Sequence, residues 1–184
     1  MPCRLNTRKF FQIPISPVQP SNLPHSPFSL DIEHKDIALL QTCRDLGVAV
    51  VAYSPIGRGM LGGQIRSPKD FGEGDFRSFA PRFSAENFPK NLELVDKITA
   101  IAKKKDCTPS QLTLAWLMAQ GDDIIPIPGT TNLQRLEENI GAMKIKLSNE
   151  EEQEIRQACE NAEVKGARYP EAFAKACFAD TPPL

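Results

Sequence analysis

The fold is decided by the stretch Gly47-Val-Ala-Val-Val-Ala-Tyr-Ser-Pro-Ile-Gly-Arg-Gly-Met-Leu-Gly-Gly63, in which a short apolar run breaks into a glycine-rich turn. Residues 48–52 are β-branched or small, so they predict a parallel strand buried on both faces. Pro55 lacks an N–H group and should end the strand. The four glycines that follow permit positive φ angles and should leave backbone N–H groups available to an anion.

Tyr53 stands at the carboxyl end of this strand, where it offers a flat ring beside the glycine-rich turn. A planar ring that carries phosphates is the kind of ligand such an arrangement would hold. The alternative is that a buried strand simply leaves through an ordinary surface loop. The spacing of the residues does not decide between these two interpretations.

Helices are expected on both sides of this strand. Apolar residues at helical spacing predict a helix over 35–46, which Gly47 should end. The long loop over 64–90 holds five phenylalanines and is expected to be packed. A further amphipathic helix should end near the basic run at 103–105, and Thr-Pro at 108–109 predicts the start of a helix buried on most sides.

A second strand and two more helices complete the pattern. Residues 124–127 (Ile-Ile-Pro-Ile) read as another buried strand, and Thr130, Thr131 or Asn132 should cap the helix that follows. The apolar residues on one face of that helix are Leu133, Leu136, Ile140 and Met143. A capping box of Ser148 and Glu151 predicts the last helix, and the tail from Val164 is expected to be irregular. This order is typical of βα units with a parallel sheet, an α/β fold.

The composition excludes several classes of function. The chain has 184 residues, 22 basic and 23 acidic, and a net charge of −1, so nothing favours binding to nucleic acid or to an anionic membrane. Its five cysteines are widely spaced and include no C-x-x-C pair, which indicates neither a disulfide framework nor a metal site. No apolar run is long enough for a membrane span. A cytoplasmic location is therefore expected.

The first 25 residues are expected to form an irregular proline-rich arm, because prolines recur there every three or four positions. This arm is interpreted as a segment that could be unrelated to the family of the domain that follows it. Of the two histidines, His25 lies in the arm and His34 at a polar helix start. We expect both to be solvated rather than catalytic.

The central motif carries a resemblance to a known family. Ala52-Tyr-Ser-Pro-Ile-Gly-Arg-Gly-Met-Leu61 resembles the seventh-strand signature of the aldo-keto reductases. The resemblance implies that Tyr53 stacks on a nicotinamide ring. It also implies that the loop contacts a pyrophosphate, through Ser54, Ile56, Gly57 and Gly59.

A second motif extends the resemblance. Ile125-Pro-Ile-Pro-Gly-Thr-Thr-Asn-Leu-Gln-Arg-Leu-Glu-Glu-Asn139 resembles the eighth-strand motif of the same family, which binds the 2′-phosphate and adenine of NADPH. The implied cofactor contacts are Thr130 for phosphate, Arg135 for the 2′-phosphate, and Glu138 and Asn139 for adenine. Gly129, also in this motif, stands where many members of the family have a lysine, which weakens the phosphate site. A helix start and a guanidinium group both suit a phosphate dianion. The alternative for Arg135 is an exposed ion pair with Glu138 on the same helix face.

The resemblance covers roughly residues 26–175 and implies a partial (β/α)8 TIM barrel, the C-terminal half of the aldo-keto reductase barrel, with the domain at 26–184. It implies NADP(H) as cofactor. The family's catalytic Asp, Tyr, Lys and His belong to the first four strands, so no catalytic residue is assigned in this chain. We expect the cofactor-binding half of a carbonyl reductase, with at most trace activity alone and a small carbonyl substrate only in a full-length form. The alternative is a non-catalytic nucleotide-binding or protein-interaction module, which could self-associate through exposed sheet edges.

Overall fold

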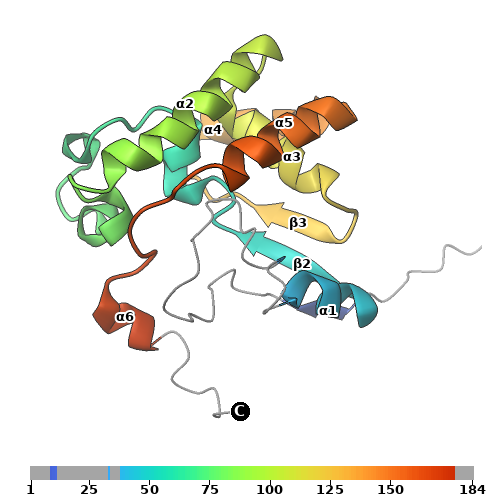
Figure 1. Cartoon of the computed structure of the whole chain (residues 1–184), viewed down its shortest axis with the longest axis horizontal. Coiled ribbons are helices and arrows are strands. Elements are labelled where there is room, and N and C mark those ends of the chain that lie inside the picture. Colours follow the sequence, from blue (N-terminus) through green and yellow to red (C-terminus); the bar gives the residue numbers. More distant parts are fainter. Residues whose placement is uncertain (1–8, 12–32, 34–37, 177–184) are drawn as a thin grey trace, which may run out of the picture.

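The computed structural model describes residues 9–11, 33 and 38–176, and in this part of the chain three parallel strands form one small sheet (Figure 1). The strands are β1 (Lys9–Phe11), β2 (Val48–Tyr53) and β3 (Ile124–Ile127). β2 lies in the middle, as its buried apolar sequence predicts. Tyr53 at the end of β2 lies opposite Ile127 at the end of β3, so both strands finish at the same edge of the sheet.

β1 corrects the expectation that the N-terminal arm is irregular throughout. Lys9 pairs with Val48 and Phe11 with Val50, so this part of the arm adds a parallel strand beside β2. Prolines do not prevent a strand at these residues, because the closely spaced series of prolines begins only at Pro14. The remainder of the arm lies outside the described residues.

The helices follow the predicted order around the two later strands. They are α1 (Leu39–Asp45), α2 (Phe88–Lys104), α3 (Pro109–Ala119), α4 (Leu133–Gly141), α5 (Asn149–Glu160) and α6 (Glu171–Ala176). Short 3-10 turns cover Gly57–Gly62, Pro68–Asp70, Phe76–Phe79, Pro81–Phe83 and Ala142–Lys144. Figure 1 shows α2, α3 and α5 grouped on one side of β2 and β3, while α6 stands apart at the end of the tail.

Local capping signals locate the helix ends as predicted. Thr108 caps α3 and Ser148 caps α5, each in a full capping box with the residue three positions on. α1 ends before Gly47, which adopts the left-handed conformation with φ 64°. The start of the predicted first helix, at 35–37, lies outside the described residues.

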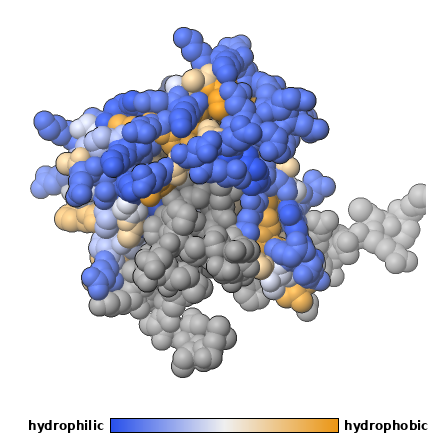
Figure 2. All heavy atoms as spheres, in the orientation of Figure 1, coloured by the Kyte–Doolittle hydropathy of each residue, from blue (hydrophilic) through white to orange (hydrophobic). Residues whose placement is uncertain are grey.

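The main core lies among α2, α3 and α5. Trp116 of α3 is 1% exposed, and its indole N–H donates to the carbonyl oxygen of Glu152 on α5 at 3.1 Å. Three of the five phenylalanines of the long loop contribute to it: Phe71, Phe83 and Phe88 contact one another with ring centroids 5.5–6.4 Å apart, whereas Phe76 and Phe79 are exposed. On the face drawn in Figure 2, hydrophilic side chains cover most of this helical layer.

Two features of the C-terminal region differ from the sequence interpretation. The apolar face of α4 is exposed: Leu133, Leu136, Ile140 and Met143 keep 69%, 44%, 50% and 62% of their surface. Helical periodicity predicts which residues share a face, but it does not tell what covers that face. The tail is also not irregular throughout, because Glu171–Ala176 form a short helix. This segment is rich in alanine, the residue with the highest helix propensity.

Candidate functional site

The turn after β2 has the tight backbone that its glycines predict. Gly57, Gly59 and Gly63 all have positive φ angles, at 58°, 91° and 74°. Two residues with side chains share this conformation: Ser54 has φ 51° and Arg58 has φ 58°. Left-handed backbone at a non-glycine residue costs of order 1–3 kcal/mol, and such residues cluster at binding sites.

The N–H groups of this turn are not all available to a ligand, which corrects the sequence interpretation. The amide of Gly57 donates to the carbonyl oxygen of Ser54 at 2.9 Å, and that of Gly59 donates to Ile56 at 3.1 Å. The chain closes into a 3-10 turn here, and this geometry uses the N–H groups internally. An anion at this turn would therefore need side-chain donors as well.

Arg77 from the long loop holds the turn in place. Its guanidinium donates to the carbonyl oxygen of Arg58 at 3.0 Å and binds the Asp75 carboxylate with two nitrogens. These hydrogen bonds lower the pKa of Asp75. A β-carbon at Gly59 would lie 3.3 Å from the Arg77 guanidinium, so glycine keeps this approach open.

Asn132 caps α4, which decides among the three residues that the sequence left open. Its side-chain oxygen accepts from the Arg135 amide at 3.1 Å, and its own amide donates to the hydroxyl of Thr130, also at 3.1 Å. Gly129 and Thr130 are exposed just before this cap. Residues 128–132 thus connect the end of β3 to the first turn of α4.

Arg135 and Glu138 do not hold each other in the ion pair considered as an alternative. The Arg135 guanidinium donates to the side-chain oxygen of Gln64 at 3.1 Å. The Glu138 carboxylate instead accepts a hydrogen bond from the hydroxyl of Thr108, the residue that caps α3. Arg135 is exposed, so its guanidinium is available to a ligand while Gln64 orients it.

These elements surround one groove with a volume of about 720 Å³. Nine of the ten predicted site residues line it: Tyr53, Ser54, Ile56, Gly59, Gly129, Thr130, Arg135, Glu138 and Asn139. The tenth, Gly57, lines a smaller neighbouring cavity that also includes Ser54. The structure therefore brings the two βα turns together at one groove.

The groove also contains residues that the sequence analysis did not select. Gln64, Asp70 and Arg77 come from the segment after the turn, and Arg58 comes from the turn itself. Arg58 lies within the motif at residues 52–61, so its positive charge in the sequence could have identified it as a site residue. The other three come from a segment without periodicity, and only the folded chain brings them to the groove.

The tail contacts Tyr53, one of the residues that line the groove. The hydroxyl groups of Tyr53 and Tyr169 are hydrogen bonded at 2.9 Å, and Arg168 donates to the Tyr53 hydroxyl at 3.4 Å. Burial, followed by the hydrogen bond to Tyr53, raises the pKa of Tyr169. Tyr53 is half-buried, so its ring forms part of the wall rather than a freely rotating surface group.

The fold and the groove together define a class. Parallel strands separated by helices place their ligands at the carboxyl ends of the strands, where the connecting turns meet. The groove lies at that edge of the sheet, between the turn after β2 and the start of α4. The chain is therefore an α/β protein with a groove at its βα turns. None of the described helices is both long and apolar enough to cross a membrane.

Comparison with known proteins identifies the family. The profile of the aldo/keto reductase family matches residues 8–160, so the chain belongs to this family, whose fold is a (β/α)8 barrel. The match begins within the proline-rich arm.

Individual relatives agree with this assignment. The chain is 54% identical to the aldo-keto reductase yakc of Schizosaccharomyces pombe, whose name specifies NADP(+), over 99% of this chain and 53% of that protein. It is 49% identical to the aldo-keto reductase str7 of Strobilurus tenacellus, over 92% of this chain and 50% of that protein. The chain thus spans about half the length of these relatives. A solved glycerol dehydrogenase of Gluconobacter oxydans superposes with a TM-score of 0.65 at 25% identity, over 77% of this chain and 42% of that one.

Proposed function

We propose that the groove binds NADP(H), and that this chain supplies the cofactor-binding C-terminal half of an NADP-dependent carbonyl reductase. One observation carries the proposal: nine residues selected from the sequence as cofactor contacts line a single groove. Its volume of about 720 Å³ lies within the usual range for ligand sites. The name of the Schizosaccharomyces pombe relative, which specifies NADP(+), supports the choice of cofactor.

Each part of this cofactor has a counterpart among the residues that line the groove. Tyr53 would face the nicotinamide, and the turn over 54–59 would lie along the pyrophosphate. Arg135 would bind the 2′-phosphate, where an exposed guanidinium and the start of α4 both favour a dianion. Glu138 and Asn139, one turn further along α4, would contact the adenine.

When bound, the cofactor would supply a hydride to a carbonyl carbon. Carbonyl reduction also needs a proton for the developing alkoxide, and acid catalysis typically contributes about 10²–10⁴-fold in rate. The family resemblance places the proton donor on the first four strands of the barrel, outside the part of the barrel that this chain resembles. We therefore expect no more than trace carbonyl-dependent oxidation of NADPH by the purified 184-residue chain, and rapid turnover would contradict the proposal.

Calorimetric titration of Arg135→Ala tests the cofactor assignment. The change should weaken NADPH binding by about ten-fold or more, because a charge-assisted hydrogen bond contributes roughly 1.5–3 kcal/mol. NADH lacks the 2′-phosphate, so its affinity should stay within about two-fold. Glu137→Ala, an exposed change on the same helix, is the matched control and should alter neither affinity. Equal losses for both cofactors would exclude Arg135 as the phosphate ligand.

A second function, association with another copy of the chain, is favoured by a separate observation. β3 is an outer strand of the described sheet, with Ile125 and Ile127 37% and 42% exposed, and α4 also has an exposed apolar face. Unpaired strand edges and apolar faces both promote association. Sedimentation velocity over a concentration series should then show dimers or larger species. Leu133→Glu should shift them toward monomer, whereas Lys144→Glu, an exposed change without apolar surface, should not.

A further inference from the structure

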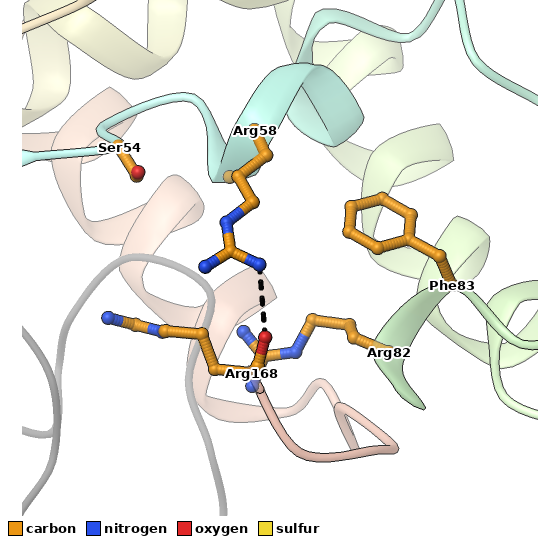
Figure 3. A pocket seen from close by; sticks show the side chains of 6 residues that line it. Ser54, Arg58, Arg82, Phe83 and Arg168 are labelled. Carbon is orange, nitrogen blue, oxygen red and sulfur yellow. Dashed lines mark hydrogen bonds between the residues drawn. The ribbon is translucent and has the colours of Figure 1, made fainter. Parts of the chain in front are cut away.

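A second cavity lies beside the groove and gathers positive charge. Its volume is about 30 Å³, and three of its lining residues are arginines: Arg58, Arg82 and Arg168. Arg58 comes from the turn after β2, Arg82 from the long loop and Arg168 from the tail, so three distant segments meet here. Figure 3 shows the side chains of Arg58 and Arg82 pointing toward the same space from different sides, while the Arg168 side chain starts beside Arg82 and extends away from it.

Aromatic rings lie against the guanidinium groups of two of these arginines. The Arg58 guanidinium lies over the rings of Tyr169 and Phe76, at 4.5 and 5.1 Å, and that of Arg168 lies 5.9 Å from the Tyr53 ring. Stacking uses the faces of a guanidinium group, whereas its N–H donors point outward in its plane. Within residues 9–11, 33 and 38–176, neither Arg58 nor Arg168 forms an ion pair with a carboxylate.

The fold holds this cluster together with specific backbone contacts. Arg58 donates to the carbonyl oxygen of Arg168 at 3.0 Å, and Arg82 donates to that of Gly166 at 3.4 Å. Arg82 is 7% exposed, so its charge is held away from bulk water. Arg58 and Arg168 are half-buried, so their positive charges repel one another more than they would in bulk water, and a bound oxyanion would offset that repulsion.

We propose that this cavity binds the carboxylate group of a substrate. About 10–15 Å³ of such volume holds one water-sized group, so about 30 Å³ matches the two oxygens of a carboxylate. Ser54 and Arg58 line both this cavity and the groove, which places the carboxylate next to Tyr53. Given the proposed function, on which this inference rests, the substrates would be small carbonyl compounds that carry a carboxylate near the reacting carbonyl.

Nuclear magnetic resonance of the arginine Nε–H groups tests the site with acetate as the probe and acetamide as its neutral counterpart. At constant ionic strength, acetate should shift the Arg58 and Arg168 signals saturably, and acetamide should not. Arg58→Gln and Arg168→Gln should each weaken acetate binding by about ten-fold or more. Arg66→Gln is the matched control, because Arg66 is an exposed arginine paired with Asp96 at 2.7 Å, and it should leave the affinity unchanged.

A repeat of the titration with NADP+ present separates the substrate from the cofactor as the source of the oxyanion. Acetate should still bind when NADP+ is saturating, and displacement by NADP+ would mean that the cavity belongs to the pyrophosphate and would overturn the proposal. Equal shifts with acetamide, or no saturable shift, would also overturn it. Calorimetry of NADP+ on the same samples reports the cofactor groove independently. Acetate binding without NADP+ binding would therefore uphold the carboxylate cavity while refuting the proposed function.

Discussion

Asn91→Ala should remove the hydrogen bonds that hold the tail to α2. Asn91 lies on α2 and is 1% exposed. Its amide nitrogen donates to the carbonyl oxygens of Arg82 and Lys165, at 2.8 and 2.9 Å, and its side-chain oxygen accepts from the Lys165 amide at 2.7 Å. One side chain therefore ties the long loop and the tail to α2.

The size of the effect follows from these contacts. Alanine would leave two carbonyl oxygens and one N–H group without their partner in a buried place, and each unsatisfied group costs about 1–3 kcal/mol. Water would reach some of them as the tail loosens, so we expect a loss of about 3 kcal/mol in the free energy of unfolding.

Urea denaturation measures this loss, with the fluorescence of Trp116, the only tryptophan, as the probe. Asn149→Ala changes an exposed asparagine and serves as the control, which should stay within about 0.5 kcal/mol. Asn91→Asp keeps the acceptor but turns a carboxylate toward two carbonyl oxygens, so it should destabilise the protein at least as much at neutral pH. A loss below about 1 kcal/mol for Asn91→Ala would refute the reasoning, because it would mean that the tail needs no such anchor.

Three further predictions concern other parts of the chain. Gly166→Ala should destabilise the protein, as seen by thermal melting, because φ is 83° there and a β-carbon would lie 2.6 Å from the Pro81 carbonyl oxygen; an unchanged melting temperature would contradict this close approach. The hydrogen bond that Lys105 donates is the largest cause of the lowered pKa of Glu151. The ionised Glu151 carboxylate should therefore contribute to stability above its ordinary pKa of 4.5, and this contribution should fade as the pH falls through the lower pKa of the folded state. In Glu151→Gln, the midpoints of urea unfolding measured at and below pH 4.5 should lack this pH dependence. Burial raises the pKa of Cys159, so this thiol should resist alkylation at pH 8 in the native protein and react after denaturation, as peptide mass spectrometry would show.

The sequence predicts those parts of the fold whose signals are local. The β-branched run at 48–52 indicates β2, and the Thr-Pro pair at 108–109 indicates the start of α3, because neighbouring residues alone determine both features. The groove was also predictable, since two βα turns at the ends of parallel strands must lie at one edge of the sheet.

The remaining features depend on contacts between distant segments. The residues of β1 show no period of their own, and they become a strand only by pairing with β2. Tyr169 meets Tyr53 across 116 positions of sequence, a separation at which no spacing rule operates. The internal bonding of the Gly57 and Gly59 amides follows from the 3-10 geometry of their turn, which glycine content alone does not specify.

The hydrogen bond between Thr108 and Glu138 connects the groove to the interior of the protein. The Thr108 hydroxyl caps α3 by accepting from the amide of Gln111 at 3.2 Å, and it donates to the Glu138 carboxylate in the groove wall. A ligand that draws this carboxylate toward itself must take it from the hydroxyl and so alter the first turn of α3. We therefore expect the Gln111 amide proton to exchange with deuterium at a rate that depends on whether the groove is filled. The amino end of a buried helix would thus report occupancy without any label placed in the site.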